Sequence, residues 1–162
     1  MAALAPRYQY SPIDSAGGEI RLLTICSGTF NAPLDLRLDI RRRVLPQPGT
    51  GSPPTAPSFE ALSYTWGAQS KPVNIQIGSC QERLSVTPNL ATALPFLRLS
   101  DRDRLVWIDA VCIDQSNLQE RGVQVQLMAE IFRQAAQVVC WVGLESANSK
   151  LAILSRDHVL LT

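Results

Sequence analysis

One segment constrains the fold of this chain more than any other: residues 105–128, LVWIDAVCIDQSNLQERGVQVQLM. It begins with the short apolar run LVWI at 105–108, which predicts a strand buried on both faces. The run ends at the carboxylate of Asp109, and a polar cluster and an amphipathic helix follow. In an open α/β sheet, ligands bind in the crevice beyond the carboxyl ends of such strands. We therefore expect a functional site at this edge.

The other apolar runs predict an α/β fold, with a mostly parallel sheet flanked by helices. Residues 59–66 and 138–142 read as further strands, and residues 118–136 as a helix that precedes the last strand. Helical spacing gives this helix an expected buried stripe, made of Leu118, Val125, Met128, Ile131, Phe132 and Ala135.

The order of the segments predicts four parts of the chain. Residues 1–45 should form a small N-terminal β extension, and residues 59–145 the α/β domain. Between them, residues 46–58 contain five prolines and no large apolar side chain, which is typical of a loop that cannot pack. Residues 146–162 read as a C-terminal tail in which one more helix is expected.

Charge and hydropathy argue against two classes of partner. The formal net charge is +1, so the chain has no strong field that would attract nucleic acid or an anionic membrane. No window approaches the length of a membrane span, and the first residues lack the apolar core of a signal peptide. We expect a cytoplasmic protein that binds neither nucleic acid nor membrane.

The histidine and the cysteines argue against two kinds of chemistry. The single histidine, His158, lies close to the last residue, which is a poor place for the base of a Ser-His or Cys-His pair. The four cysteines are widely spaced, with no CxxC pair, so no zinc site is expected.

Glu120 is the candidate for which two roles compete. Asn117 and Glu120 have the spacing of a capping box, with Asn117 as the N-cap and Glu120 as its partner in the first turn. The alternative is catalysis, in which the carboxylate would stabilise a cation that develops on a substrate. The residues alone leave both roles open.

The same polar edge supplies the candidates for a ligand site. Asp109 ends a buried strand, so its carboxylate would either bind a ligand or brace the next loop through backbone N–H groups. Trp66 ends the strand at 59–66 and should lie at the same edge, where its ring would stack on a ligand or fill the core. The predicted ligand-binding residues are Trp66, Gly67, Asp109, Asp114, Gln115 and Arg121.

Four segments together resemble the fungal heterokaryon-incompatibility (HET) domain. They are FEALSYTWG at 59–67, the segment 87–97, WIDAVCIDQ at 107–115 and ERGVQVQLMAEIF at 120–132. The segment AQVVCWVG at 136–143 is similar to the last common strand of the family. Their order and spacing over residues 8–145 make the match specific.

The resemblance implies a part in fungal non-self recognition, in which fusion of incompatible hyphae triggers programmed cell death. It also implies an α/β fold distantly similar to Toll/interleukin-1 receptor (TIR) domains. Some TIR domains hydrolyse NAD with a glutamate on the helix after their third strand, and Glu120 has the comparable place here. By this analogy NAD would be a substrate, no cofactor is expected, and the protein would be an NAD nucleosidase.

The chain departs from the family pattern in two respects. Pro95 stands where a helix former is usual, and the chain ends soon after residue 143. From this end we expect a fragment, a truncated gene model or a short paralogue that lacks part of the fold. Two alternatives to an NAD nucleosidase remain open. One is a non-catalytic interaction module, which acts by self-association or by binding an incompatibility partner protein. The other is an inactive paralogue.

Overall fold

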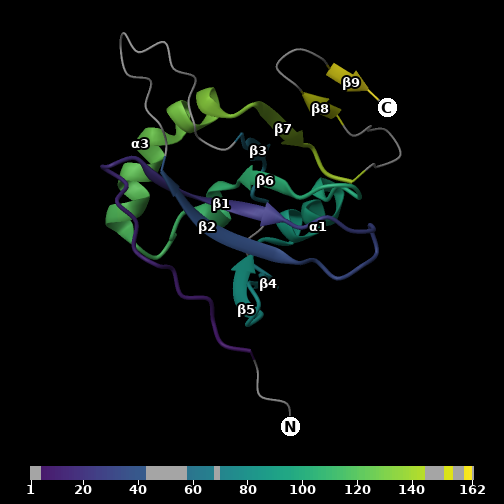
Figure 1. The fold of residues 1–162 in the computed structure, drawn as a ribbon, viewed down its shortest axis with the longest axis horizontal. Helices are drawn as coiled ribbons and strands as arrows, with labels where there is room; N and C mark the ends of the chain where they lie inside the picture. The colour runs from purple at the N-terminus through teal and green to yellow at the C-terminus, as the bar shows by residue number, and fades with distance from the viewer. Residues whose placement is uncertain (1–4, 43–57, 68–69, 145–151, 155–158, 162) are drawn as a thin grey trace.

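The computed structural model describes residues 5–42, 58–67, 70–144, 152–154 and 159–161 (Figure 1). Within them, a five-stranded sheet has the strand order β2-β1-β6-β3-β7. Its strands are β1 Glu19–Ile25, β2 Leu36–Arg42, β3 Glu60–Tyr64, β6 Arg104–Trp107 and β7 Gln137–Trp141. The buried side chains of the sheet and of the helices beside it form one hydrophobic core.

The prediction of an α/β fold is confirmed, but the sheet is mixed. Strands β6, β3 and β7 run parallel to one another, whereas β1 is antiparallel to both β2 and β6. The expectation of a mostly parallel sheet therefore holds only for β6, β3 and β7. An apolar run shows that a strand is buried on both faces, but it does not show in which direction the neighbouring strands run.

Strands β1 and β2 come from residues 1–45, which the sequence predicts as an N-terminal β extension. Strand β1 lies inside the sheet, between β2 and β6, and Ile20, Leu22, Leu23 and Ile25 are buried along it. These residues therefore supply part of the same sheet that holds the predicted site. The predicted loop at 46–58 falls almost entirely outside the described residues.

A hairpin and a helix lie between β3 and β6. Strands β4 (Val73–Ile77) and β5 (Glu82–Val86) pair antiparallel, and α1 (Pro88–Leu97) follows directly. Thr87 caps α1, since its hydroxyl accepts a hydrogen bond from the Leu90 N–H at 3.4 Å. Pro95 stands in the last turn, and the helix ends soon after it, at Leu97.

Helix α3 (Leu118–Gln134) begins with a different buried face from the one that the sequence predicts. Leu118 and Val125 were expected in the core, but they are 68% and 54% exposed. Glu120 and Gln124 are buried in their place. Because apolar side chains occur on more than one side of this half of the helix, spacing alone selects the wrong side.

The second half of α3 follows the prediction. Ile131 and the following Ala135 are buried, and Met128 and Phe132 are packed against the core. The ring of Phe132 meets the ring of the buried Trp107 edge to face, with centroids 5.7 Å apart. The helix is thus attached to the sheet by apolar contacts at its C-terminal end and by polar contacts at its N-terminal end.

The predicted helix in the tail is wrong for the part that the structure describes. Residues Ala152–Leu154 and Val159–Leu161 form strands β8 and β9, which pair antiparallel with each other. None of the helices described here is both long and apolar enough to cross a membrane.

Candidate functional site

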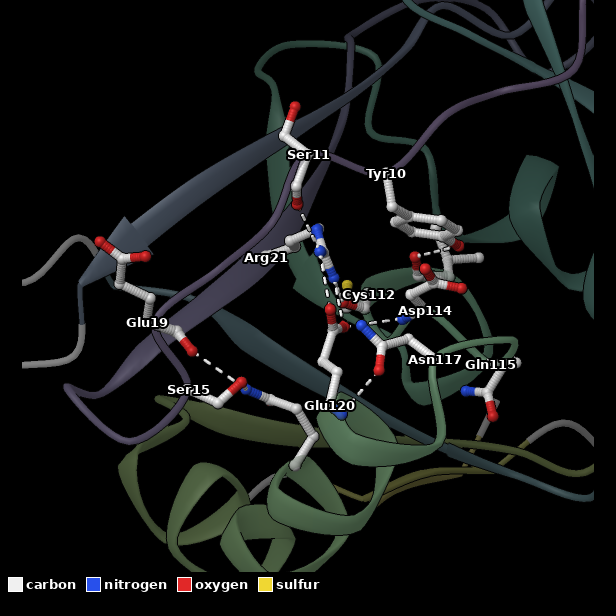
Figure 2. Close-up of polar contacts among 12 residues, drawn as sticks. Tyr10, Ser11, Ser15, Glu19, Arg21, Cys112, Asp114, Gln115, Asn117 and Glu120 are labelled. Atoms are coloured by element: carbon white, nitrogen blue, oxygen red, sulfur yellow. Dashed lines mark hydrogen bonds and ion pairs between the residues drawn. The ribbon is translucent and has the colours of Figure 1, made fainter.

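Glu120 and Arg21 form a buried ion pair between α3 and β1 (Figure 2). The Arg21 Nη1 and Nη2 atoms donate to the two carboxylate oxygens of Glu120 at 2.6 and 3.0 Å. The Arg21 side chain is 2% exposed and the Glu120 side chain 6% exposed. Two parallel hydrogen bonds between a guanidinium and a carboxylate fix the geometry as well as the charge.

The pair also holds three segments of backbone in place. The Asp114 N–H donates to Glu120 Oε1 at 2.8 Å. Arg21 donates to the carbonyl oxygens of Ser11 and Cys112 at 2.6 and 3.1 Å. The ring of Tyr10 lies over the guanidinium, 4.8 Å from its central carbon. The ion pair therefore joins the N-terminal segment, β1 and the loop before α3.

The capping box is present only in part. The Asn117 side chain accepts a hydrogen bond from the Glu120 N–H at 3.1 Å, as the sequence predicts for an N-cap. The reciprocal bond from the Asn117 N–H goes to the Asp114 carbonyl at 3.1 Å, because the Glu120 carboxylate is bonded to Arg21. A catalytic role for Glu120 stays a prediction.

Asp109 is the centre of a second polar cluster, at the start of the one-turn helix α2 (Asp109–Cys112). Its carboxylate accepts hydrogen bonds from Trp66 Nε1 at 2.9 Å and from the Ala110 N–H at 2.7 Å. Its carbonyl accepts from the Gln115 side chain at 2.9 Å. Asp109 thus braces its own loop and also fixes the indole of Trp66.

Burial raises the pKa of the Asp109 carboxyl above its usual range, although hydrogen bonds from Trp66 and Ala110 act in the opposite direction. The buried hydroxyl of Tyr64 lies near this carboxylate and has no hydrogen-bond partner among the described residues. A carboxyl group with a raised pKa beside a cleft is a common feature of functional sites.

Most of the predicted ligand-binding residues border one cleft. A cavity of about 440 Å³ is lined by Trp66, Asp109, Ile113, Gln115, Arg121, Val125 and Met128. Gly67 directly follows Trp66 and has a φ of +70°, a backbone conformation that favours glycine. The prediction that this edge gathers polar and aromatic side chains is therefore consistent with the geometry, and ligand binding stays a prediction.

Two of the predicted site residues lie apart from this cleft. Asp114 lines a neighbouring cavity of about 290 Å³, and its carboxylate accepts from the Ser116 N–H and hydroxyl at 3.0 and 2.6 Å. Glu120 faces Arg21 and does not line the cavity beside Asp109. In the described part of the chain, no group of three or more His, Cys, Asp or Glu side chains could hold a metal ion.

The sequence interpretation missed Arg21 and Gln124. Gln124 lies one helical turn after Glu120, and its amide donates to the Ser15 hydroxyl at 2.9 Å and to the Glu19 carbonyl at 3.0 Å. The signal for Arg21 was present in the run IRLLTI at 20–25, because a charge inside a buried strand needs a partner of opposite charge. The partner itself lies 99 positions away along the chain, which no local pattern indicates.

Comparison with known proteins identifies the family. The sequence model described as "Heterokaryon incompatibility protein (HET)" matches residues 59–159. Heterokaryon incompatibility protein 6, OR allele, of Neurospora crassa is 40% identical over 103 residues, which cover 57% of this chain and 15% of that protein. No solved structure matches the chain. Because the family match spans more than half of the chain, including strands β3, β6 and β7 and the cleft beside Asp109, the chain belongs to the heterokaryon-incompatibility (HET) family.

Proposed function

We propose that this HET domain acts in fungal non-self recognition and in the programmed cell death that follows fusion of incompatible hyphae. Membership of the family supports the proposal, as does the name of the Neurospora crassa relative. In this role the domain works in the cytoplasm as a non-catalytic interaction module. Its partner is a second copy of itself or an incompatibility partner protein.

The ion pair of Glu120 is the observation that favours an interaction module over NAD cleavage. A catalytic glutamate would have to face the ribose, where positive charge develops as nicotinamide leaves. Both oxygens of Glu120 are instead bonded to Arg21, and one of them also accepts from the Asp114 N–H. Separating a buried pair and leaving one charge alone costs about 3–5 kcal/mol, so this carboxylate is poorly placed to serve a substrate.

NAD cleavage in the manner of TIR domains is the second candidate function, and Asp109 is the observation that favours it. Its carboxyl group has a raised pKa and borders the cavity of about 440 Å³ beside the indole of Trp66. The reaction would consume NAD and water and release nicotinamide and ADP-ribose. In this version Asp109, and not Glu120, would be the acidic group nearest to the substrate.

Nicotinamide release separates the two candidates. Purified protein is incubated with NAD, beside the variants Glu120→Gln and Asp109→Asn, and nicotinamide is quantified by chromatography. The interaction module predicts no release by any of the three proteins at high protein concentration. Release by the wild type that is lost in Glu120→Gln, while that variant remains folded, contradicts the proposal. Release that is lost only in Asp109→Asn supports the second candidate.

A further inference from the structure

We propose that two copies of this domain associate through α3, each helix packing an exposed apolar stripe against the same stripe of the other in the antiparallel direction. The inference rests on the interaction-module function proposed above, and it names both the partner and the surface. The α3 stripe consists of Leu118, Gly122, Val125, Ala129 and Phe132.

The α3 stripe lies on the side of the helix that the sheet does not cover. Leu118 and Val125 are 68% and 54% exposed, and the small residues Gly122 and Ala129 are exposed as well. The members follow one another in alternating steps of four and three residues, which brings them to one side of a helix. None of the five carries a charge or a polar group in its side chain. This spacing is the one by which helices pack along a common seam.

Gly122 indicates that a neighbour can approach this side closely. A glycine inside a helix is less stable than an alanine, so its presence needs a reason. The described part of the domain gives none, because a Cβ built at Gly122 meets no atom within 4 Å. Gly122 and Ala129 together let a second helix come to the short end of the usual helix–helix distances, about 8–10 Å.

The order of large and small side chains in the α3 stripe fits a second copy of itself. Val125 is the middle member, with a small residue on each side of it and a large residue at each end. A two-fold axis through Val125 places Gly122 opposite Ala129 of the second copy. The same axis places Leu118 opposite Phe132. The stripe is therefore self-complementary, as a symmetric dimer interface must be.

The charged side chains beside the α3 stripe are compatible with this arrangement. Arg121 lies on one border of the stripe and Arg133 on the other. In the antiparallel pair Arg121 faces Met128 of the second copy, and Arg133 faces Gln119, whose amide oxygen accepts hydrogen bonds. No two arginines are opposed, and antiparallel helices bring the opposite ends of their dipoles together.

A second copy suits the α3 stripe better than the longest stretch outside the described residues does. Most of that stretch, residues 46–57, contains no large apolar side chain that could cover the stripe. Helix α3 has 17 residues and is therefore about 25 Å long. One pair of such helices buries less than the roughly 1,200 Å² at which stable interfaces begin. We therefore expect a weak dimer that forms where the domain is concentrated.

Sedimentation velocity of the purified chain over a range of concentrations tests the proposal. The wild type should shift from monomer to dimer as its concentration rises. Val125→Glu opposes two carboxylates at the axis and should weaken the dimer about tenfold or more. Val123→Glu is the matched control, because it makes the same change on α3 away from the stripe, at a residue that is 37% exposed. It should dimerise like the wild type.

Gly122→Leu adds an independent variant in case Val125→Glu does not fold. Its new side chain begins in open space in the monomer but lies between the two helices in the dimer. It should therefore keep the fold, measured by circular dichroism, and weaken the dimer about tenfold. Dimerisation of a folded Gly122→Leu as tight as that of the wild type overturns the close approach of the helices.

Cross-linking tests the antiparallel direction, in a background of Cys80→Ser that removes the exposed native thiol. A short thiol cross-linker should join two copies of Val125→Cys across the axis. It should not join two copies of Leu118→Cys, which lie about 20 Å apart in the antiparallel pair. Efficient joining of Leu118→Cys overturns this direction.

A wild type that stays monomeric at every concentration, or a Val125→Glu variant that dimerises equally well, overturns the proposal. Neither sedimentation nor cross-linking measures NAD or cell death. A monomeric chain that still causes death would therefore contradict this inference alone, and the interaction module would act through an incompatibility partner protein.

Discussion

Arg21 lies between Ile20 and Leu22 in a strand that is buried along most of its length. Its position explains why Glu120 is buried, since a buried guanidinium needs a carboxylate and the first turn of α3 supplies one. The same bonds draw the Asp114 N–H and the Ser11 carbonyl toward the pair. Glu120 thus holds Arg21 and the backbone around it in place, and the catalytic role that the family analogy implies stays a prediction.

Removing one member of this pair should therefore destabilise the fold strongly. We expect Arg21→Met to lower the free energy of unfolding by about 3–5 kcal/mol, because the Glu120 charge is left buried and alone. The double variant Arg21→Met/Glu120→Leu should recover most of this loss. Asp101→Asn, in an exposed pair with Arg102, is the matched control and should change stability by about 0–1 kcal/mol. Urea denaturation of the wild type and the three variants measures these differences. Equal losses of unfolding free energy in Arg21→Met and Asp101→Asn would contradict a stabilising role of the buried pair.

Asp109 makes a prediction about pH. Because burial raises its folded-state pKa above the unfolded value, the folded protein holds this proton more tightly than the unfolded chain does. The contribution of Asp109 to stability should therefore decline as pH rises from about 4, the ordinary carboxyl range, through the raised folded value. The variant Asp109→Asn should lack this decline. The measurement is the difference in unfolding free energy between wild type and variant at several pH values, and a difference that grows in favour of the wild type as pH rises contradicts the assignment.

At the scale of secondary structure, the sequence predicts where elements occur better than which face they bury. The buried strand after residue 104, the helix cap at Asn117 and the C-terminal core contacts of α3 follow from local patterns. The burial of Glu120 does not follow from a local pattern, because it depends on its partner Arg21 on β1. The polar edge around Asp109 could likewise be predicted, since residues that end parallel strands meet at one edge. The direction of β1 could not be predicted. An apolar run that is buried on both faces has the same pattern whether the strand runs parallel or antiparallel to its neighbours.

Substitutions along α3 test its buried face. Leu118→Ala should change the unfolding free energy by less than about 0.5 kcal/mol, because the side chain is mostly exposed. Ile131→Ala should lower it by about 2–5 kcal/mol, because it leaves a cavity in the core. Asn117→Ala, which removes the cap, should lower it by about 0.5–2 kcal/mol. Thermal or urea denaturation ranks the three variants, and a large loss with Leu118→Ala contradicts the assignment of faces.

At the scale of the whole molecule, residues 19–42 and the family-matched region share one sheet (Figure 1). Strand β1 covers the edge of β6, and its Arg21 balances the charge on α3. The family match begins at residue 59, yet the fold of that region uses two strands that precede it.

A chain that begins at residue 46 should therefore fail to fold cooperatively. It would lack β1, one of the two neighbours of β6, and would leave the Glu120 carboxylate buried without its partner. Circular dichroism and urea denaturation compare it with the full chain. A sharp unfolding transition of similar midpoint in the shortened chain contradicts this dependence.

A cell-death assay in a filamentous fungus that expresses the chain from an inducible promoter distinguishes an interaction module from an NAD-cleaving enzyme. The variant Arg21→Met/Glu120→Leu removes the carboxylate and keeps an apolar core, so it separates the structural role of Glu120 from a catalytic one. If the domain is an interaction module, the wild type and this variant should cause death to the same extent when they accumulate equally, without a fall in cellular NAD. Death that depends on the Glu120 carboxylate in a folded, equally abundant protein, accompanied by NAD loss, contradicts it.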